Sequence, residues 1–133
     1  MILGIGIDSV NIERFYQYHE HPEEMLLKMF SQAEIDYSLS KPQPAANFAA
    51  RFATREAFFK AYQGMLHLYM KDHPATLLTI NKHIEVTRTE RGLPLIKADW
   101  ARLLPIGINE PKIHLSITHT DTIATAMVIL ETA

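Results

Sequence analysis

Hydrophobic residues alternate with small or polar residues at both ends of the chain, which is the pattern of β-strands. Segment 2–8 reads I-L-G-I-G-I-D, so Leu3, Ile5 and Ile7 share one parity while two glycines and Asp8 share the other. Side chains of a strand alternate between its two faces. The glycine face therefore leaves room for another backbone, or for a ligand beside Asp8.

The C-terminal end repeats this alternation. Segment 112–118 places isoleucine and leucine on one face and polar side chains, including His114 and Ser116, on the other. A turn near 119–122 and a second strand over 123–131 complete a hairpin. A row of polar groups on one face of a sheet is suited to binding a ligand.

The middle of the chain has a helical pattern. Residues 45–70 contain no proline and many helix formers, which predicts one long helix with a weak point near Gly64. Glu56 and Lys60 are four residues apart and share one partly buried edge of this helix. The aromatic residues expected to form its core stripe are Phe48, Phe52, Phe59 and Tyr62.

Shorter elements fill the rest of the chain. Ser31 and Glu34 have the spacing of a capping box, which marks the start of a helix. The other expected elements are a short helix over 11–18, two short helices or one kinked helix over 22–39, a loop over 71–74, a hairpin over 83–97 that turns at Arg91-Gly92, and a short helix over 98–104. Helices gathered against strands that are joined mainly by hairpins predict an α+β fold.

Length and composition restrict the function classes. The 133 residues fit one domain, 1–133, and 47% are apolar. The absence of cysteine excludes disulfide scaffolds and thiolate zinc sites. A net charge of −2 lacks the basic excess of most nucleic-acid binders, and no apolar run approaches the roughly 20 residues of a membrane span. We therefore expect a soluble, cytoplasmic protein with no nucleic-acid or membrane partner.

Asp8, Glu56 and Lys60 are the first candidates for chemistry. Mg²⁺ prefers oxygen ligands and is commonly shared between one or two carboxylates and the phosphates of a substrate. Asp8 at a strand end and Glu56 on the long helix fit this pattern, and Lys60 would place a positive charge over the same phosphates. The residues also allow a second interpretation, in which Glu56 and Lys60 form an ordinary helix pair and Asp8 caps the helix that follows.

Arg51 and Arg55 are also four residues apart on this helix. Such a pair ordinarily forms a solvated helix edge. Beside a phosphate site, however, the two guanidinium groups are suitable ligands for phosphate oxygens.

Three motifs occur in the order, and at about the spacing, of a known family. The chain resembles the holo-acyl-carrier-protein synthases, which are 4′-phosphopantetheinyl transferases, over nearly its whole length. The matching segments are I-L-G-I-G-I-D at 2–8, A-A-R-F-A-T-R-E-A-F-F-K-A at 49–61 and H-L-S-I-T-H-T at 114–120, with S-Q-A-E-I-D-Y at 31–37 and R-G-L-P at 91–94 in support.

The resemblance implies an enzyme of fatty acid biosynthesis. It would transfer 4′-phosphopantetheine from coenzyme A to a serine of an apo acyl carrier protein and release adenosine 3′,5′-bisphosphate. On the family's pattern Asp8 and Glu56 bind Mg²⁺, and Lys60 contacts the coenzyme A phosphates, which makes Glu56 and Lys60 the catalytic residues. Removal of the serine proton stays open between Glu56 and a metal-bound water.

The resemblance also implies an assembly and a docking surface. The family forms homotrimers with each active site between neighbouring subunits, and His114 and Ser116 would reach coenzyme A across that interface. Carrier proteins present an acidic helix, for which this chain offers the basic residues Arg14 and Lys28.

The chain departs from the family's pattern on the long helix. The family usually has lysine where Arg55 stands; arginine keeps the charge, so Arg51 and Arg55 remain candidate coenzyme A ligands. After Ala61 the family continues towards a Gly-Thr-Gly turn, which this chain lacks. The alternative function is therefore a relative that keeps the trimeric fold but acts as a binding or structural protein. A different Mg²⁺ enzyme acting on a pyrophosphate or nucleotide is a second alternative.

Overall fold

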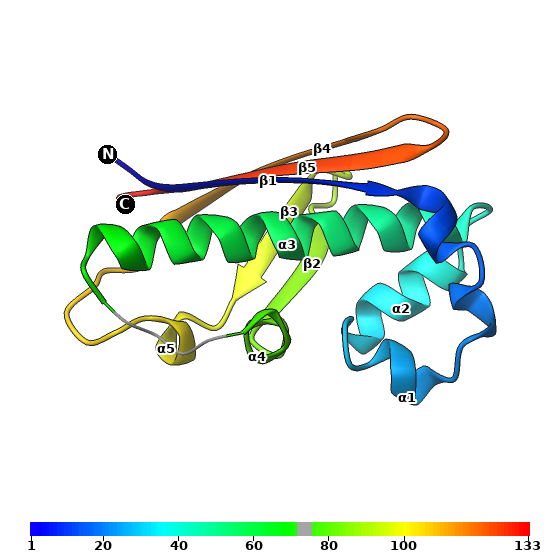
Figure 1. Cartoon of the computed structure of the whole chain (residues 1–133), viewed down its shortest axis with the longest axis horizontal. Helices are drawn as coiled ribbons and strands as arrows, with labels where there is room; N and C mark the ends of the chain where they lie inside the picture. Colours follow the sequence, from blue (N-terminus) through cyan, green and yellow to red (C-terminus); the bar gives the residue numbers. More distant parts are fainter. Residues whose placement is uncertain (72–75) are drawn as a thin grey trace.

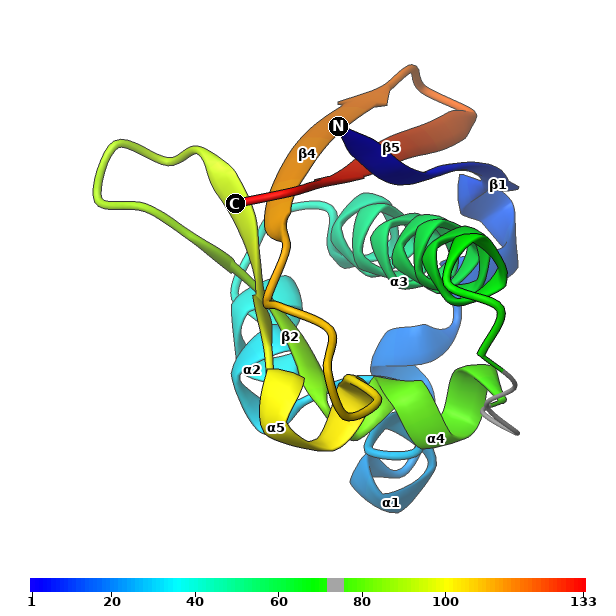
Figure 2. The ribbon, with the colours of Figure 1, turned by 90° about the vertical axis from the view of Figure 1, so that its left-hand side faces the viewer.

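The structure is a computed structural model that describes residues 1–71 and 76–133. One long helix lies beneath a three-stranded sheet, while a separate hairpin and short helices lie on the helix's other side (Figures 1 and 2). The expected α+β class is confirmed. The elements are β1 (Ile2–Asn11), η1 (Ile12–Phe15), η2 (Tyr18–Glu20), α1 (Glu23–Leu26), α2 (Gln32–Leu39), α3 (Pro44–Leu68), α4 (Leu77–Asn81), β2 (Ile84–Arg88), β3 (Pro94–Ala98), α5 (Trp100–Leu103), β4 (Lys112–His119) and β5 (Ile123–Glu131).

The sheet has the order β1-β5-β4 and is antiparallel throughout. The hairpins β4–β5 and β2–β3 form as the sequence predicts. Strand β1 extends beyond the expected end at Asp8, because its pairing with β5 continues to Asn11 opposite Ile123. The loop expected over 71–74 lies, apart from Lys71, outside the described residues.

The two ends of the chain lie side by side (Figure 1). The amino group of Met1 donates to Thr132 Oγ1 at 2.8 Å, and the backbone N–H of Thr132 donates to the Met1 carbonyl at 2.9 Å. These bonds extend the pairing of the first strand with the last one beyond the ladder itself.

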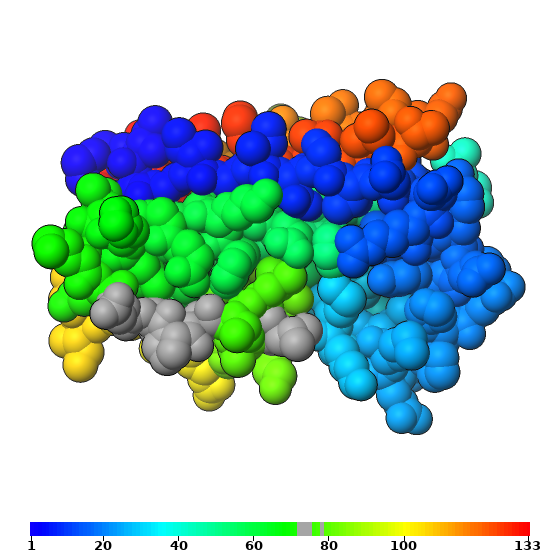
Figure 3. Space-filling model, viewed as in Figure 1, coloured from blue at the N-terminus to red at the C-terminus, as the bar shows by residue number. Residues whose placement is uncertain are grey.

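The glycines of β1 let the strand lie directly on the backbone of α3. A Cβ added at Gly4 would lie 2.0 Å from the carbonyl oxygen of Ala61, and one at Gly6 would lie 1.8 Å from that of Ala57. No real side chain fits such distances, so the expectation that this face admits another backbone is confirmed. The outer face of the strand carries Ile5 and Ile7, both exposed. Figure 3 shows β1 lying along most of the length of α3.

Helix α3 is continuous through Gly64, where the sequence predicts a weak point. An added Cβ at Gly64 would lie 3.7 Å from the Cα atom of Gly4, an ordinary contact distance. The helix stays regular because its C-terminal half packs between β1 and the hydrophobic core, in which Tyr62, Met65 and Leu66 are fully buried. Tertiary packing thus outweighs the low helix propensity of one glycine.

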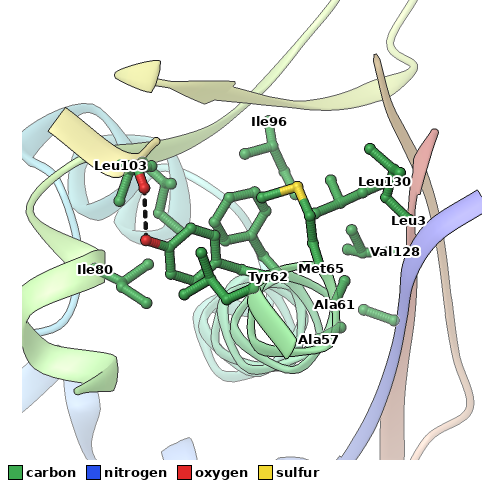
Figure 4. Packing of buried hydrophobic residues seen from close by; sticks show 14 of the residues in the cluster. Leu3, Ala57, Ala61, Tyr62, Met65, Ile80, Ile96, Leu103, Val128 and Leu130 are labelled. Carbon is green, nitrogen blue, oxygen red and sulfur yellow. Dashed lines mark hydrogen bonds between the residues drawn. The ribbon is translucent and has the colours of Figure 1, made fainter. Parts of the chain in front are cut away.

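The expected core stripe is correct at Phe48, Phe52 and Tyr62 and wrong at Phe59. Phe58 is fully buried, whereas Phe59 is only partly buried against the core. The reason is that α3 has the sheet on one side and α4, α5 and the β2–β3 hairpin on the other, so it is not a helix with a single apolar face. The hydroxyl of Tyr62 donates to the carbonyl of Leu103 at 2.6 Å, which connects α3 to α5 (Figure 4).

The short helices follow their capping signals. Ser31 and Glu34 form the predicted capping box at the start of α2, and segment 22–39 contains two short helices. Helix α4 was not predicted from the sequence, although Thr76 and Thr79 cap it reciprocally. Among the described residues, no helix combines the length and apolar character that crossing a bilayer requires.

Candidate active site

Asp8 lies on the face of β1 that is turned towards α3. It follows Gly4 and Gly6 on that face, and its register partner on β5 is Ala126, whose side chain is fully buried. The Asp8 side chain is 16% exposed, so its carboxylate lies near the surface with limited access to water. Within the described residues its Oδ2 atom is buried and has no hydrogen-bond partner.

Lys60 of α3 reaches Asp8 across the helix–strand contact. Its Nζ donates to Asp8 Oδ1 at 3.2 Å and to the carbonyl oxygen of Ile7 at 2.9 Å. The lysine therefore pairs with the strand carboxylate. The alternative interpretation fails at Asp8: the residue before η1 is Asn11, and Asp8 does not cap that helix.

Glu56 lies one helical turn before Lys60 and faces the same region. Burial raises the pKa of the Glu56 carboxyl above its ordinary value, and the negative charge of Asp8 raises it further. Lys60 and Arg14 act in the opposite direction. Two carboxylates from β1 and α3 are thus brought within electrostatic range of each other, as the sequence predicts.

This pair of acids fits a divalent cation. Two like charges disfavour each other unless a cation lies between them, and the unpartnered Oδ2 of Asp8 is an oxygen ligand without another use. Over the described residues no third histidine, cysteine or carboxylate joins them. Two carboxylates suit Mg²⁺ better than a metal ion that takes all its ligands from the protein, because Mg²⁺ keeps several waters and shares substrate phosphates.

Arg14 lies near the acid pair, and Lys28 lies elsewhere. The guanidinium of Arg14 is 4.6 Å from the centroid of the Phe52 ring, and its charge acts on Glu56. Lys28 lines a surface cavity of about 590 Å³ between the α1–α2 connection and the β2–β3 hairpin. The two predicted docking residues therefore border different parts of the surface.

Arg55 is not placed at the acid pair. Its side chain is 1% exposed, forms an ion pair with Glu34, and donates to the carbonyls of Asn81 at 2.9 Å and Ile84 at 3.1 Å. The second carboxylate oxygen of Glu34 accepts the backbone N–H of Val86 at 2.8 Å. The expectation of a solvated edge or a phosphate ligand is thus corrected: Arg55 connects α3 to α2, α4 and β2 inside the protein.

Arg51 is also buried, but it borders a cavity. Its guanidinium carbon lies 4.2 Å from the centroid of the Tyr37 ring, and its Nε has no partner in the described part of the chain. Burial lowers the pKa of Arg51, with a smaller contribution from the charge of Arg88. Arg51, Arg88 and His119 line a cavity of about 170 Å³. The sequence interpretation did not single out Arg88, which ends β2, or His119, although His119 lies inside the closing motif.

His114 and Ser116 lie on the outer face of the sheet, with the expected parity. Ser116 is in register with Met127, which pairs with Ile7, whereas Asp8 has the opposite parity. Within one chain the sheet therefore separates these two residues from the acid pair. His114 Nε2 lies 2.8 Å from Glu131 Oε2, and this hydrogen bond lowers the pKa of Glu131.

Comparisons with known proteins identify the family to which this chain is similar. A model of the 4′-phosphopantetheinyl transferase superfamily matches residues 4–121. A holo-[acyl-carrier-protein] synthase from Clostridium perfringens is 34% identical, covering 98% of this chain and 95% of the relative. One from Thermodesulfovibrio yellowstonii is 37% identical, covering 98% and 99%.

Solved structures show the same fold. A holo-(acyl-carrier-protein) synthase from Bacillus anthracis in complex with CoA (3′,5′-ADP) superposes with a TM-score of 0.69 at 26% identity, over 100% of this chain and 99% of that one. An ACPS–CoA complex from Chronobacterium ammoniagenes gives 0.74 at 26% identity, over 98% and 97%.

The chain therefore belongs to the 4′-phosphopantetheinyl transferase superfamily. Within that superfamily it is an enzyme of the holo-[acyl-carrier-protein] synthase group, because the family match, the relatives over nearly full length and the fold agree.

Proposed function

We propose that this chain catalyses the Mg²⁺-dependent transfer of 4′-phosphopantetheine from coenzyme A to a serine of an apo acyl carrier protein, with release of adenosine 3′,5′-bisphosphate. The observation that carries the proposal is the meeting of Asp8, Glu56 and Lys60 across the β1–α3 contact. Because its reactants would be coenzyme A and a carrier protein, the proposal includes a cytoplasmic location and a role in fatty acid biosynthesis.

The chemistry requires positive charge at a pyrophosphate. The serine oxygen forms a bond to the β-phosphorus of coenzyme A, and the bond from that phosphorus to the bridging oxygen breaks, leaving the bisphosphate. Bound Mg²⁺ would supply template and Lewis-acid chemistry for the phosphate oxygens. Asp8 and Glu56 would hold it, and Lys60 would stabilise the negative charge of the leaving phosphate. The serine proton goes either to Glu56 or to a water.

Arg51 supports the placement of coenzyme A. A buried arginine with an unpartnered Nε beside a small cavity is suited to a phosphate, which provides several acceptor oxygens. Arg88 lines the same cavity and adds a second positive charge. We therefore include Arg51 among the coenzyme A ligands and leave Arg55 out, because its hydrogen bonds are made inside the protein.

The sheet supports the proposal of a homotrimer. Ile5 and Ile7 are each 57% exposed and Met127 is 40% exposed, all on the outer face that also carries His114 and Ser116. Apolar residues gathered on one face are suited to contact with another protein surface. Burial against a second copy would bring His114 and Ser116 of one subunit towards coenzyme A bound to the next subunit.

Charge supports the proposed carrier docking. Arg14 lies beside the acid pair, where an acidic carrier helix would have to approach for its serine to reach the phosphorus. Lys28 lies further along the connection that follows α1 and would contact a more distant part of the same partner. Opposite charges at such a surface mainly increase the rate of association.

A transfer assay tests the function directly. The chain is incubated with coenzyme A, Mg²⁺ and a panel of apo carrier proteins, and the carriers are examined by mass spectrometry. We expect a phosphopantetheine mass gain on at least one carrier, and loss of that gain in Asp8→Asn and Glu56→Gln variants that keep the wild-type circular dichroism spectrum. A wild-type chain that binds coenzyme A without modifying any carrier would favour the binding-protein alternative, and coenzyme hydrolysis without a carrier would favour a different Mg²⁺ enzyme.

A further inference from the structure

Lys60 is held on β1 by two acceptors. Its ammonium bonds to Asp8 Oδ1 at 3.2 Å and to the carbonyl oxygen of Ile7 at 2.9 Å. The side chain is 50% exposed, whereas that of Asp8 is 16% exposed. The positive charge therefore reaches from the surface back to the partly enclosed carboxylate.

This position overlaps with the one that a metal ion needs. The Lys60 ammonium bonds to Asp8 Oδ1, and the charges of Asp8 and Lys60 both act on Glu56. A divalent cation between the two acids would repel an ammonium bonded to one of them, because like charges at about 4 Å repel by roughly 1 kcal/mol per unit charge even at the dielectric constant of water.

We propose that Lys60 is an internal competitor of the metal ion at Asp8. In the metal-free chain its ammonium neutralises Asp8 beside Glu56. Metal binding displaces the ammonium from Asp8, and the displaced side chain, anchored on the exposed edge of α3, is then available to the phosphates of coenzyme A. This inference rests on the proposed function, since it assumes that Asp8 is a metal ligand.

The competition couples the two ligands. Phosphates that attract the Lys60 ammonium remove it from Asp8 and so favour the metal, and by linkage the metal favours the phosphates by the same factor. A lysine that stayed on Asp8 throughout would give no such coupling. If the Lys60 ammonium opposes the metal at Asp8, removing it raises the metal affinity.

The test is direct binding of Mn²⁺, followed by the electron paramagnetic resonance signal of the free ion, with no coenzyme present. Four proteins are compared: the wild type, Lys60→Met, Asp8→Asn and Arg14→Met. Arg14→Met is the matched control, because it removes a positive charge that also acts on Glu56 while its guanidinium lies on the Phe52 ring. Circular dichroism checks that each variant is folded.

We expect Lys60→Met to bind Mn²⁺ about tenfold more tightly than the wild type, as expected from removing a like charge at contact distance. Arg14→Met should change the affinity much less, and Asp8→Asn should lose specific binding. Equal affinities of Lys60→Met and wild type, or an equal gain in Arg14→Met, would overturn the competition while Asp8→Asn still reports on the metal site. Wild-type affinity in Asp8→Asn would instead refute the metal assignment in the proposed function.

Discussion

Glu56 is ionisable in a place that disfavours its charge. The carboxyl is partly buried and faces Asp8, and both effects raise its pKa in the folded protein above the ordinary value of 4.5. A side chain placed for chemistry rather than for stability often has such an environment. Because the pKa is raised in the folded state, the free energy of unfolding must depend on pH through Glu56.

The raised pKa of Glu56 determines the direction of this pH dependence. The folded state holds the Glu56 proton to higher pH than the unfolded state does, so this group's stabilisation is complete at acid pH and is lost as pH rises through the raised pKa. In the absence of metal we expect Glu56→Gln to be more stable than the wild type at neutral pH, by less than about 1 kcal/mol since solvent screens the carboxyl. The difference should disappear below pH 4.5. Urea denaturation at several pH values, with EDTA present, measures it; a wild type that is the more stable at pH 7 would contradict the prediction.

We expect Arg55 to affect the free energy of unfolding more than Glu56 does. It is buried with Glu34, and its other hydrogen bonds go to backbone carbonyls of α4 and β2. Removing one member of a buried ion pair leaves the other charge uncompensated. We expect Arg55→Ala to lower the free energy of unfolding by about 3–5 kcal/mol.

The control for that prediction is the double variant Arg55→Met with Glu34→Leu. It removes both charges of the pair and should recover much of the loss in the same chemical denaturation experiment. If Arg55→Ala were as stable as the wild type, the proposed structural role of the pair would be refuted.

At the scale of elements, the contact between β1 and α3 places the acids. Gly6 has no room for a methyl group, because a Cβ there would lie 1.8 Å from the Ala57 carbonyl oxygen. Gly64, on the helix side of the same contact, has its nearest neighbour at 3.7 Å. Gly64 therefore has room for a methyl group and Gly6 does not, although both lie where β1 meets α3.

Alanine substitutions should therefore have opposite effects. Gly6→Ala forces the strand from the helix and should cost about 2 kcal/mol or more, as overpacking does, with a fall in transferase activity because Asp8 moves relative to Glu56. Gly64→Ala should be neutral or stabilising by up to about 1 kcal/mol, because alanine is the better helix former. Thermal unfolding and the carrier assay on both variants give the comparison. A Gly6→Ala variant with the stability and activity of the wild type would show that the clash at Gly6 relaxes without consequence.

The sequence predicted the helices and strands better than it predicted which of their side chains are buried. The absence of proline and the many helix formers over 45–70 predicted α3, and the glycines of β1 indicated room for another backbone or a ligand, of which the structure shows the backbone. Phe59 and Arg55 were misplaced because helical periodicity assumes one buried face, whereas α3 is covered on two sides by elements distant in sequence. Helix α4 was missed because it is short and its only local signal is the Thr76–Thr79 cap.

At the scale of the whole molecule, one chain of the proposed trimer would contribute residues to two different sites. The acid pair lies beneath the sheet, while His114 and Ser116 lie above it with exposed isoleucines. A complete site in the proposed trimer therefore combines the lower half of one subunit with the upper half of the next.

Mixing inactive variants tests this arrangement. We expect His114→Ala and Asp8→Ala each to have strongly reduced transfer, and a co-refolded mixture of the two to regain part of the activity, because some interfaces then combine an intact Asp8 with an intact His114. Mixing each variant with itself is the control. If the mixture were no more active than the average of its components, sites shared between subunits would be disproved.

The pairing of the first strand with the last has a consequence for the order of events during synthesis. Asp8 leaves the ribosome early, but β1 hydrogen-bonds to β5, which is synthesised after every other described element. A nascent chain that stops before 123 already contains both acids and the lysine, yet it lacks the strand that holds Asp8 against α3. Premature termination should therefore yield fragments that carry every catalytic side chain and no catalytic power.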